Sequence, residues 1–123
     1  MSIRILVVED DENIRETIEF LLCRAGYEVS TCSTGKDIFT SIENYNPHLI
    51  LLDILLGELN GRDICRAIKK NRETSHIPVI IISSMHNVYN AIADEGANDV
   101  IAKPFTEDIL LTRINRQLAK IAS

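Results

Sequence analysis

Carboxylates, hydroxyls and one lysine follow short apolar runs in this sequence. The residues in these positions are Glu9, Asp10, Asp11, Glu12, Asp53, Ser83, Ser84 and Lys103. Two carboxylates about 4 Å apart repel by roughly 4 kcal/mol at an effective dielectric near 20, so an acidic cluster needs a proton or a cation. At pH 7 we expect a cation, and all-oxygen surroundings favour Mg²⁺, with Mn²⁺ as a second choice, over zinc.

The same side chains suit phosphoryl chemistry. Magnesium commonly takes a phosphate oxygen as a further ligand, so a bound ion would bring phosphate into an otherwise repulsive site. Lys103 would neutralise one phosphoryl oxygen, and the Ser83 hydroxyl would donate a hydrogen bond to another. Asp53 stands alone after its apolar run, and we predict that it is a nucleophile able to form an acyl phosphate.

Strands and helices must alternate to position these residues. The apolar runs cover residues 3–8, 49–52, 79–82 and 100–102, and each is continuous, as in strands buried on both faces of a parallel sheet. The more polar segment 28–32 suits an edge strand. Helical spacing lies between the runs, first in Ile14, Ile18, Leu21, Leu22 and Ala25 and last in Leu111, Ile114, Leu118 and Ile121. The pattern predicts one doubly wound α/β domain of five β-α units over residues 1–123.

Polar residues and glycines mark the expected helix ends. The candidate N-caps are Asp11, Thr34, Asn60 and Thr106, and Gly26 and Gly96 lie where a left-handed residue ends a helix. With the spatial strand order 2-1-3-4-5, Asp10 and Asp53 would lie on neighbouring strands about 4.8 Å apart. The Lys103 stem could then close much of a gap of roughly 10 Å to Asp53.

Composition excludes several other classes of protein. The chain has 123 residues, of which 46% are apolar, and a formal charge of -5, which does not favour direct nucleic-acid binding. The three cysteines, Cys23, Cys32 and Cys65, lack the spacing of a zinc site or a disulfide framework. No apolar run has the roughly 18 residues that a membrane span needs. We therefore expect no membrane contact and a cytoplasmic location.

The sequence resembles response regulator receiver domains over essentially its whole length. The matching segments are I-L-V-V-E-D-D-E at residues 5–12, L-I-L-L-D at 49–53, Gly61, I-I-I-S-S at 80–84, G-A-N-D at 96–99 and K-P-F at 103–105. A lone acidic pair or a lone K-P is weak evidence, whereas four strand-end matches in the right order are strong. The resemblance implies the flavodoxin-like receiver topology.

The resemblance also implies a phosphoacceptor switch of a two-component system. Asp53 would accept phosphate from a histidine kinase or a phosphotransfer protein, and an output domain or effector protein would respond. Glu9, Asp10, Asp53 and the Leu55 carbonyl would hold Mg²⁺, and Ser83 and Lys103 would contact the phosphoryl group. Lys103 and Pro104 are expected to share a cis peptide bond. Such a switch turns over no external metabolite, so we do not expect an enzyme.

The sequence departs from the receiver pattern at three places. Val100 stands where an aromatic residue usually reports phosphorylation, so Ser83 and Val100 are switch positions without a rotating ring. The segment from Ser83 to Gly96 is about two residues shorter than expected for the family. Gly57 replaces the usual proline after the phosphorylation site, which should loosen the following loop. All three departures concern signal output and leave the predicted chemistry intact.

Three alternative functions remain open from the sequence. A flavodoxin-like FMN carrier shares the topology, but the four acids at residues 9–12 would repel the FMN phosphate. A small phosphohydrolase working through an aspartyl phosphate would need an acid-base group where Leu55 stands. A degenerate receiver controlled by protein binding alone would not need the complete set of site residues.

Overall fold

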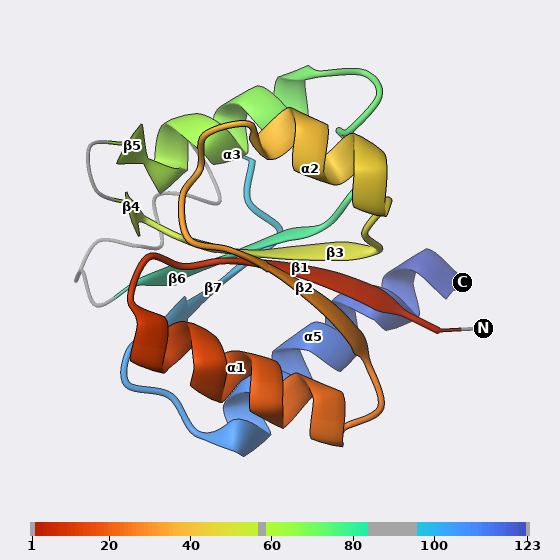
Figure 1. The fold of residues 1–123 in the computed structure, drawn as a ribbon. Helices are drawn as coiled ribbons and strands as arrows, with labels where there is room; N and C mark the ends of the chain where they lie inside the picture. Colours follow the sequence, from red (N-terminus) through yellow and green to blue (C-terminus); the bar gives the residue numbers. More distant parts are fainter. Residues whose placement is uncertain (1, 57–58, 84–95, 123) are drawn as a thin grey trace.

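A five-stranded parallel sheet forms the centre of the protein, with helices on both faces (Figure 1). The computed structural model describes residues 2–56, 59–83 and 96–122. The strands of this sheet are β1 (Arg4–Val8), β2 (Glu28–Cys32), β3 (Leu49–Asp53), β6 (Val79–Ser83) and β7 (Asp99–Ala102). They pair in the order β2-β1-β3-β6-β7, and all pairs are parallel. Counted along the chain, this is the predicted order 2-1-3-4-5, which the structure confirms.

The helices form two layers around the sheet. α1 (Glu12–Arg24) and α5 (Glu107–Ala122) cover one face, and α2 (Ile38–Tyr45) and α3 (Gly61–Lys70) cover the other (Figure 1). The helix expected between Ser83 and Gly96 falls at residues 84–95, outside the described residues. No helix in the described part of the chain is long and apolar enough to cross a membrane.

Burial on both faces explains why the strand sequences do not alternate. Successive residues of β1 and β3 pack into two different hydrophobic clusters, one under α2 and α3 and the other under α1 and α5. Every residue of β3 and β6 is buried, whereas β2 at the sheet edge is mostly half-buried. The prediction of an edge position for residues 28–32 is therefore confirmed.

The predicted helix faces are largely correct. Ile18 and Leu22 of α1 are fully buried, and Ile114 of α5 packs against the same face of the sheet. Ile121 was expected on the apolar face of α5 but is 52% exposed, because it lies in the last turn of that helix. Leu110, near the start of α5, is fully buried, although the sequence pattern did not single it out.

Three of the four predicted N-caps have the expected geometry, and one is wrong. Asp11 accepts a hydrogen bond from the Ile14 N–H, and Asn60 accepts one from the Arg62 N–H. Thr106, directly before α5, accepts one from the Ile109 N–H. Thr34 is not the cap of α2, because the chain makes a further turn and the helix begins only at Ile38. The Thr34 hydroxyl instead accepts a hydrogen bond from the Lys36 N–H within that turn.

Replacing Asn60 with alanine is expected to lower the free energy of unfolding by about 1 kcal/mol, because the start of α3 loses its capping acceptor. The Asn60 Oδ1 atom lies 2.8 Å from the Arg62 nitrogen. Urea unfolding measures the loss, and Thr34→Ala is the matched control because it removes a hydroxyl that caps no helix. Equal loss in both variants would contradict the assignment.

A two-stranded hairpin follows β3 and was not predicted. β4 (Leu55–Leu56) and β5 (Leu59–Asn60) pair antiparallel and lead directly into α3. Each strand has only two residues, which is too short for a periodic pattern to show. Gly57, where we expected a loosened loop, lies outside the described residues.

Candidate functional site

Three acidic side chains meet at the carboxyl ends of β1 and β3. Glu9 and Asp10 directly follow β1, and Asp53 is the last residue of β3, the strand beside it. One carboxylate oxygen from each of these residues lies within 4.8 Å of the others. Glu9 and Asp53 are only 2% and 6% exposed, whereas Asp10 is exposed. The cluster therefore has two buried members and one that faces solvent.

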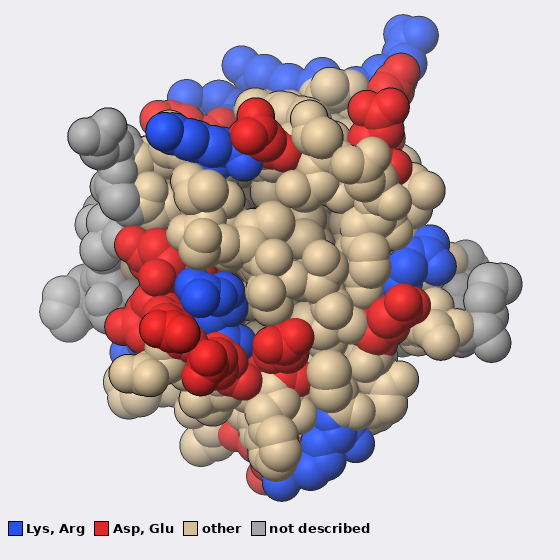
Figure 2. Space-filling view, in the orientation of Figure 1, with Lys and Arg blue, Asp and Glu red and all other residues tan. Residues whose placement is uncertain are grey.

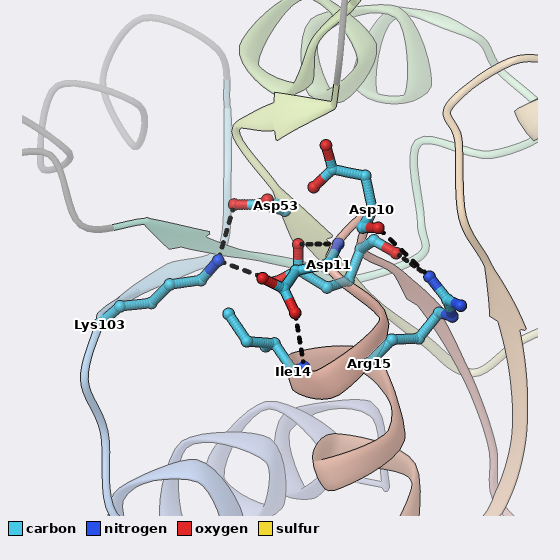
Figure 3. A network of polar contacts seen from close by, with 7 residues as sticks. Asp10, Asp11, Ile14, Arg15, Asp53 and Lys103 are labelled. Carbon is cyan, nitrogen blue, oxygen red and sulfur yellow. Dashed lines mark hydrogen bonds and ion pairs between the residues drawn. The ribbon is translucent and has the colours of Figure 1, made fainter.

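Lys103 reaches into this cluster from the end of β7. Its Nζ atom lies 2.8 Å from Glu9 Oε1 and 3.3 Å from Asp53 Oδ1 (Figure 3). The Lys103 main-chain N–H donates to the Ser83 carbonyl, which ties the end of β7 to the end of β6. The peptide bond between Lys103 and Pro104 is cis.

The surroundings raise the pKa of both Lys103 and Glu9. Burial would lower the pKa of Lys103, but its contacts with Glu9 and Asp53 outweigh burial and raise that pKa above its usual value. Burial raises the pKa of Glu9, and the neighbouring Asp53 raises it further, against the opposing effect of Lys103. Lys103 is therefore an ammonium at neutral pH and offsets part of the repulsion among the carboxylates.

Acidic side chains gather at one edge of the molecular surface shown in Figure 2, with basic side chains among them. The acidic group lies over the end of β1, where the chain turns into α1. Such a surface attracts cations and repels free anions.

The donor atoms of the cluster fit a hard divalent cation. Carboxylate oxygens are the ligands that Mg²⁺ and Mn²⁺ prefer, and the acids converge from two strands whose positions the sheet fixes. Among the residues that the structure describes, no cysteine or histidine belongs to this group of possible metal ligands.

Of the other predicted site residues, Ser83 lies at the end of a strand, Leu55 begins one and Val100 lies within one. Ser83 is the buried last residue of β6, and Leu55 opens β4 two residues after Asp53. Val100 is buried in β7, where it pairs with Ile81. The hydroxyl role of Ser83, the carbonyl role of Leu55 and the switch role of Val100 stay predictions. Ser84 lies outside the described residues.

Two residues that shape the site were not assigned a role from the sequence. Arg15 of α1 donates hydrogen bonds to the main-chain carbonyls of Glu9 and Asp10. Gly61 packs so tightly on the end of β3 that a Cβ atom there would lie less than 3.0 Å from the Asp53 carbonyl oxygen. The position of Arg15, four residues after the helix cap Asp11, could have indicated a side chain that folds back on the acidic loop. Nothing in one sequence indicates the packing of Gly61.

In the absence of divalent ions, Asp10→Asn is expected to raise the melting temperature by roughly 3 °C, because it removes one of three mutually repelling carboxylates. Asp10 is the member without an ammonium partner among the described residues. Added Mg²⁺ should stabilise the wild-type protein and stabilise Asp10→Asn much less. Thermal unfolding with and without Mg²⁺ measures both effects, and Asp108→Asn, an exposed position on α5, is the control. A lower melting temperature for Asp10→Asn without metal would contradict the expected repulsion.

Comparison with known proteins gives a consistent result. The family model described as response regulator receiver domain matches residues 5–115. The response regulator ArlR of Staphylococcus saprophyticus is 39% identical over 119 residues, which cover 95% of this chain and 53% of that protein. The regulatory protein VanRB of Enterococcus faecalis is 35% identical over 122 residues, which cover 98% of this chain and 54% of that protein. The chain thus spans about half the length of these curated relatives.

Solved structures show the same fold. A response regulator receiver domain protein from Methanospirillum hungatei superposes with a TM-score of 0.88 at 29% sequence identity, over 98% of this chain and 96% of that one. The two chains agree over nearly their whole lengths, so the five-stranded topology described above is also that of this receiver domain protein.

Proposed function

The chain belongs to the response regulator receiver family of two-component systems, and on this premise we propose that it is a phosphoacceptor switch whose acceptor is Asp53. The observation that carries the proposal is the position of Asp53. It ends the central strand β3, with the Lys103 ammonium 3.3 Å from its Oδ1 atom and two further acids beside it. These positions support the proposal, because a nucleophile, a cation for phosphoryl oxygens and a set of metal ligands would then lie in one site.

The proposed donor is a phosphohistidine of a partner histidine kinase or phosphotransfer protein. An Asp53 carboxylate oxygen attacks the phosphorus, a P–O bond forms and the P–N bond breaks. The electron pair returns to the imidazole nitrogen, which then takes a proton from water. Lys103 moves from Glu9 and Asp53 to a phosphoryl oxygen, and the Ser83 hydroxyl donates to a second one.

Glu9, Asp10, Asp53 and the Leu55 carbonyl would hold Mg²⁺ or Mn²⁺. When bound, the ion supplies positive charge that offsets the repulsion between the attacking carboxylate and the phosphoryl oxygens. Glu9 has a second task in this proposal, because its contact with Lys103 keeps the ammonium beside Asp53 before phosphate arrives.

A groove beside the site supports docking of the phosphodonor protein. It has a volume of about 440 Å³ and runs between α1 and the residues that follow β7. Its apolar lining includes Ile14, Leu21, Pro104 and Phe105, and Lys103 also lines it. An apolar helix of the donor seated there would lie next to the acceptor carboxylate.

The proposed output is a change in binding to an output domain or effector protein. The chain itself would contact neither nucleic acid nor membrane, would act in the cytoplasm and would turn over no external metabolite. Ser83 and Val100 remain the proposed switch positions. Because Val100 is a small buried side chain, the signal would pass through packing in β7 and not through rotation of an aromatic ring.

Mass spectrometry of the intact protein tests the proposal. Incubation with a small acyl phosphate or phosphoramidate and Mg²⁺ is expected to add one phosphoryl group, and incubation with the same donor and a chelator is expected to add none. Peptide mapping should place the group on the fragment that contains Asp53. A protein that gains no mass with Mg²⁺ would contradict the proposed function.

A further inference from the structure

The segment that joins β1 to α1 carries two of the three clustered acids, and both of its ends are fixed. The Glu9 N–H donates to the Cys32 carbonyl at 3.0 Å, which continues the pairing of β1 with β2. At the other end, Asp11 caps α1 through the Ile14 N–H at 3.1 Å. Asp10 lies between these two anchors.

The carboxylate of Asp10 differs from its two neighbours in how it is held. Those of Glu9 and Asp53 both contact the Lys103 ammonium. Within residues 2–56, 59–83 and 96–122, no group makes a hydrogen bond or ion pair with the Asp10 carboxylate. Its position therefore depends on its own side-chain rotamer and on the orientation of the main chain that carries it.

Arg15 holds that main chain. Its Nη1 atom lies 3.0 Å from the Glu9 carbonyl oxygen and 3.5 Å from the Asp10 carbonyl oxygen, so one guanidinium nitrogen bridges two successive peptide groups (Figure 3). The helix that carries Arg15 is fixed against the sheet, because its residues Ile18 and Leu22 are fully buried in the core. Hydrogen bonds from a charged donor are stronger than those between neutral groups.

We propose that Arg15 is a positioning residue for the acidic cluster. By holding the Glu9 and Asp10 carbonyls, it keeps the Asp10 carboxylate in place to share a divalent cation with Glu9 and Asp53. This inference rests on the proposed function, since it concerns the same metal-dependent site.

The positioning role and a purely electrostatic role predict opposite results. If only the charge of Arg15 mattered, its removal would strengthen cation binding, since a nearby positive charge repels the ion. If Arg15 holds the main chain, its removal weakens cation binding despite the loss of repulsion. Arg15→Lys separates the two roles further, because lysine keeps the charge but lacks the planar guanidinium.

Isothermal titration calorimetry with Mg²⁺ alone is the test. Arg15→Met is expected to raise the dissociation constant about tenfold, which corresponds to the loss of roughly one charge-assisted hydrogen bond. Arg15→Lys should weaken binding in the same direction. The matched control is Arg116→Met on the exposed side of α5, which should bind Mg²⁺ as the wild-type protein does. Equal or tighter binding by Arg15→Met, or wild-type affinity in both Arg15 variants, would overturn the inference.

Phosphorylation kinetics give a second readout that general destabilisation does not reproduce. The Mg²⁺ concentration that gives half the maximal rate with a small phosphodonor should rise in both Arg15 variants, whereas the rate at saturating Mg²⁺ should stay within about twofold of wild type. If Arg15→Met does not fold, Arg15→Lys alone decides the question.

A wild-type protein that neither binds Mg²⁺ nor accepts phosphate would overturn the proposed function together with this inference. A wild-type protein that does both, beside unaffected Arg15 variants, would overturn this inference alone.

Discussion

Asp53→Asn is expected to abolish phosphoryl uptake completely, because a neutral amide lacks the nucleophilic oxygen that forms the acyl phosphate. The substitution nearly preserves the side-chain volume at a position that is only 6% exposed, so the fold should persist. Lys103 keeps its ion pair with Glu9 at 2.8 Å and continues to occupy the site. A loss of phosphorylation would therefore result from the missing carboxylate and not from unfolding of the site.

Intact mass spectrometry after incubation with phosphodonor and Mg²⁺ measures this loss. Asp108→Asn is the matched control, because it makes the same chemical change in the exposed first turn of α5 and should take up one phosphoryl group as the wild-type protein does. If Asp53→Asn still gained a phosphoryl group, the acceptor would be another residue and the central role of Asp53 would be wrong.

Gly61→Ala is expected to lower the free energy of unfolding by about 3 kcal/mol and to slow phosphorylation strongly. A Cβ atom at Gly61 would lie 2.8 Å from the Ile54 Cα atom and also under 3.0 Å from the Asp53 carbonyl. Both neighbours are main-chain atoms of the segment that carries the acceptor, and the Gly61 N–H donates to the Ile54 carbonyl at 2.7 Å. The added methyl group must therefore push the start of α3 away from the end of β3.

Gly35→Ala provides the control for this prediction. A Cβ atom at Gly35 would also come under 3.0 Å from a neighbour, but that neighbour is the terminal methyl group of Ile64, which can rotate away. Urea unfolding should show a loss several times smaller than at Gly61, and phosphorylation should be near normal. A stability of Gly61→Ala within about 0.5 kcal/mol of wild type would show that the junction of β3 and α3 relaxes easily.

The parts of the fold that could be predicted from sequence are those that local pattern determines. Continuous apolar runs indicated the strands of the sheet because β1, β3 and β6 are buried on both faces. Parallel strands bring their carboxyl ends to one edge, so the meeting of Glu9, Asp10 and Asp53 followed from strand order alone. The reach of Lys103 followed from the length of its side chain.

The features that sequence did not reveal depend on contacts between distant segments or on very short elements. The β4–β5 hairpin has two residues in each strand, so it has no detectable period. The position of Thr34 fitted a helix cap, but the additional turn before Ile38 displaced the start of α2. The roles of Arg15 and Gly61 arise from the main-chain groups that they contact, and only the spacing of Arg15 from the helix cap Asp11 gives any sign of such a contact in the sequence.

The contact of Lys103 with two of the three carboxylates has a consequence for ionic selectivity. One ammonium among three carboxylates leaves two formal negative charges at the ends of β1 and β3. A divalent ion would make the assembly electroneutral, whereas sodium or potassium would leave it anionic, and a trivalent ion would leave it cationic. The charge balance alone would therefore favour divalent ions over monovalent and trivalent ones, apart from any effect of ionic radius.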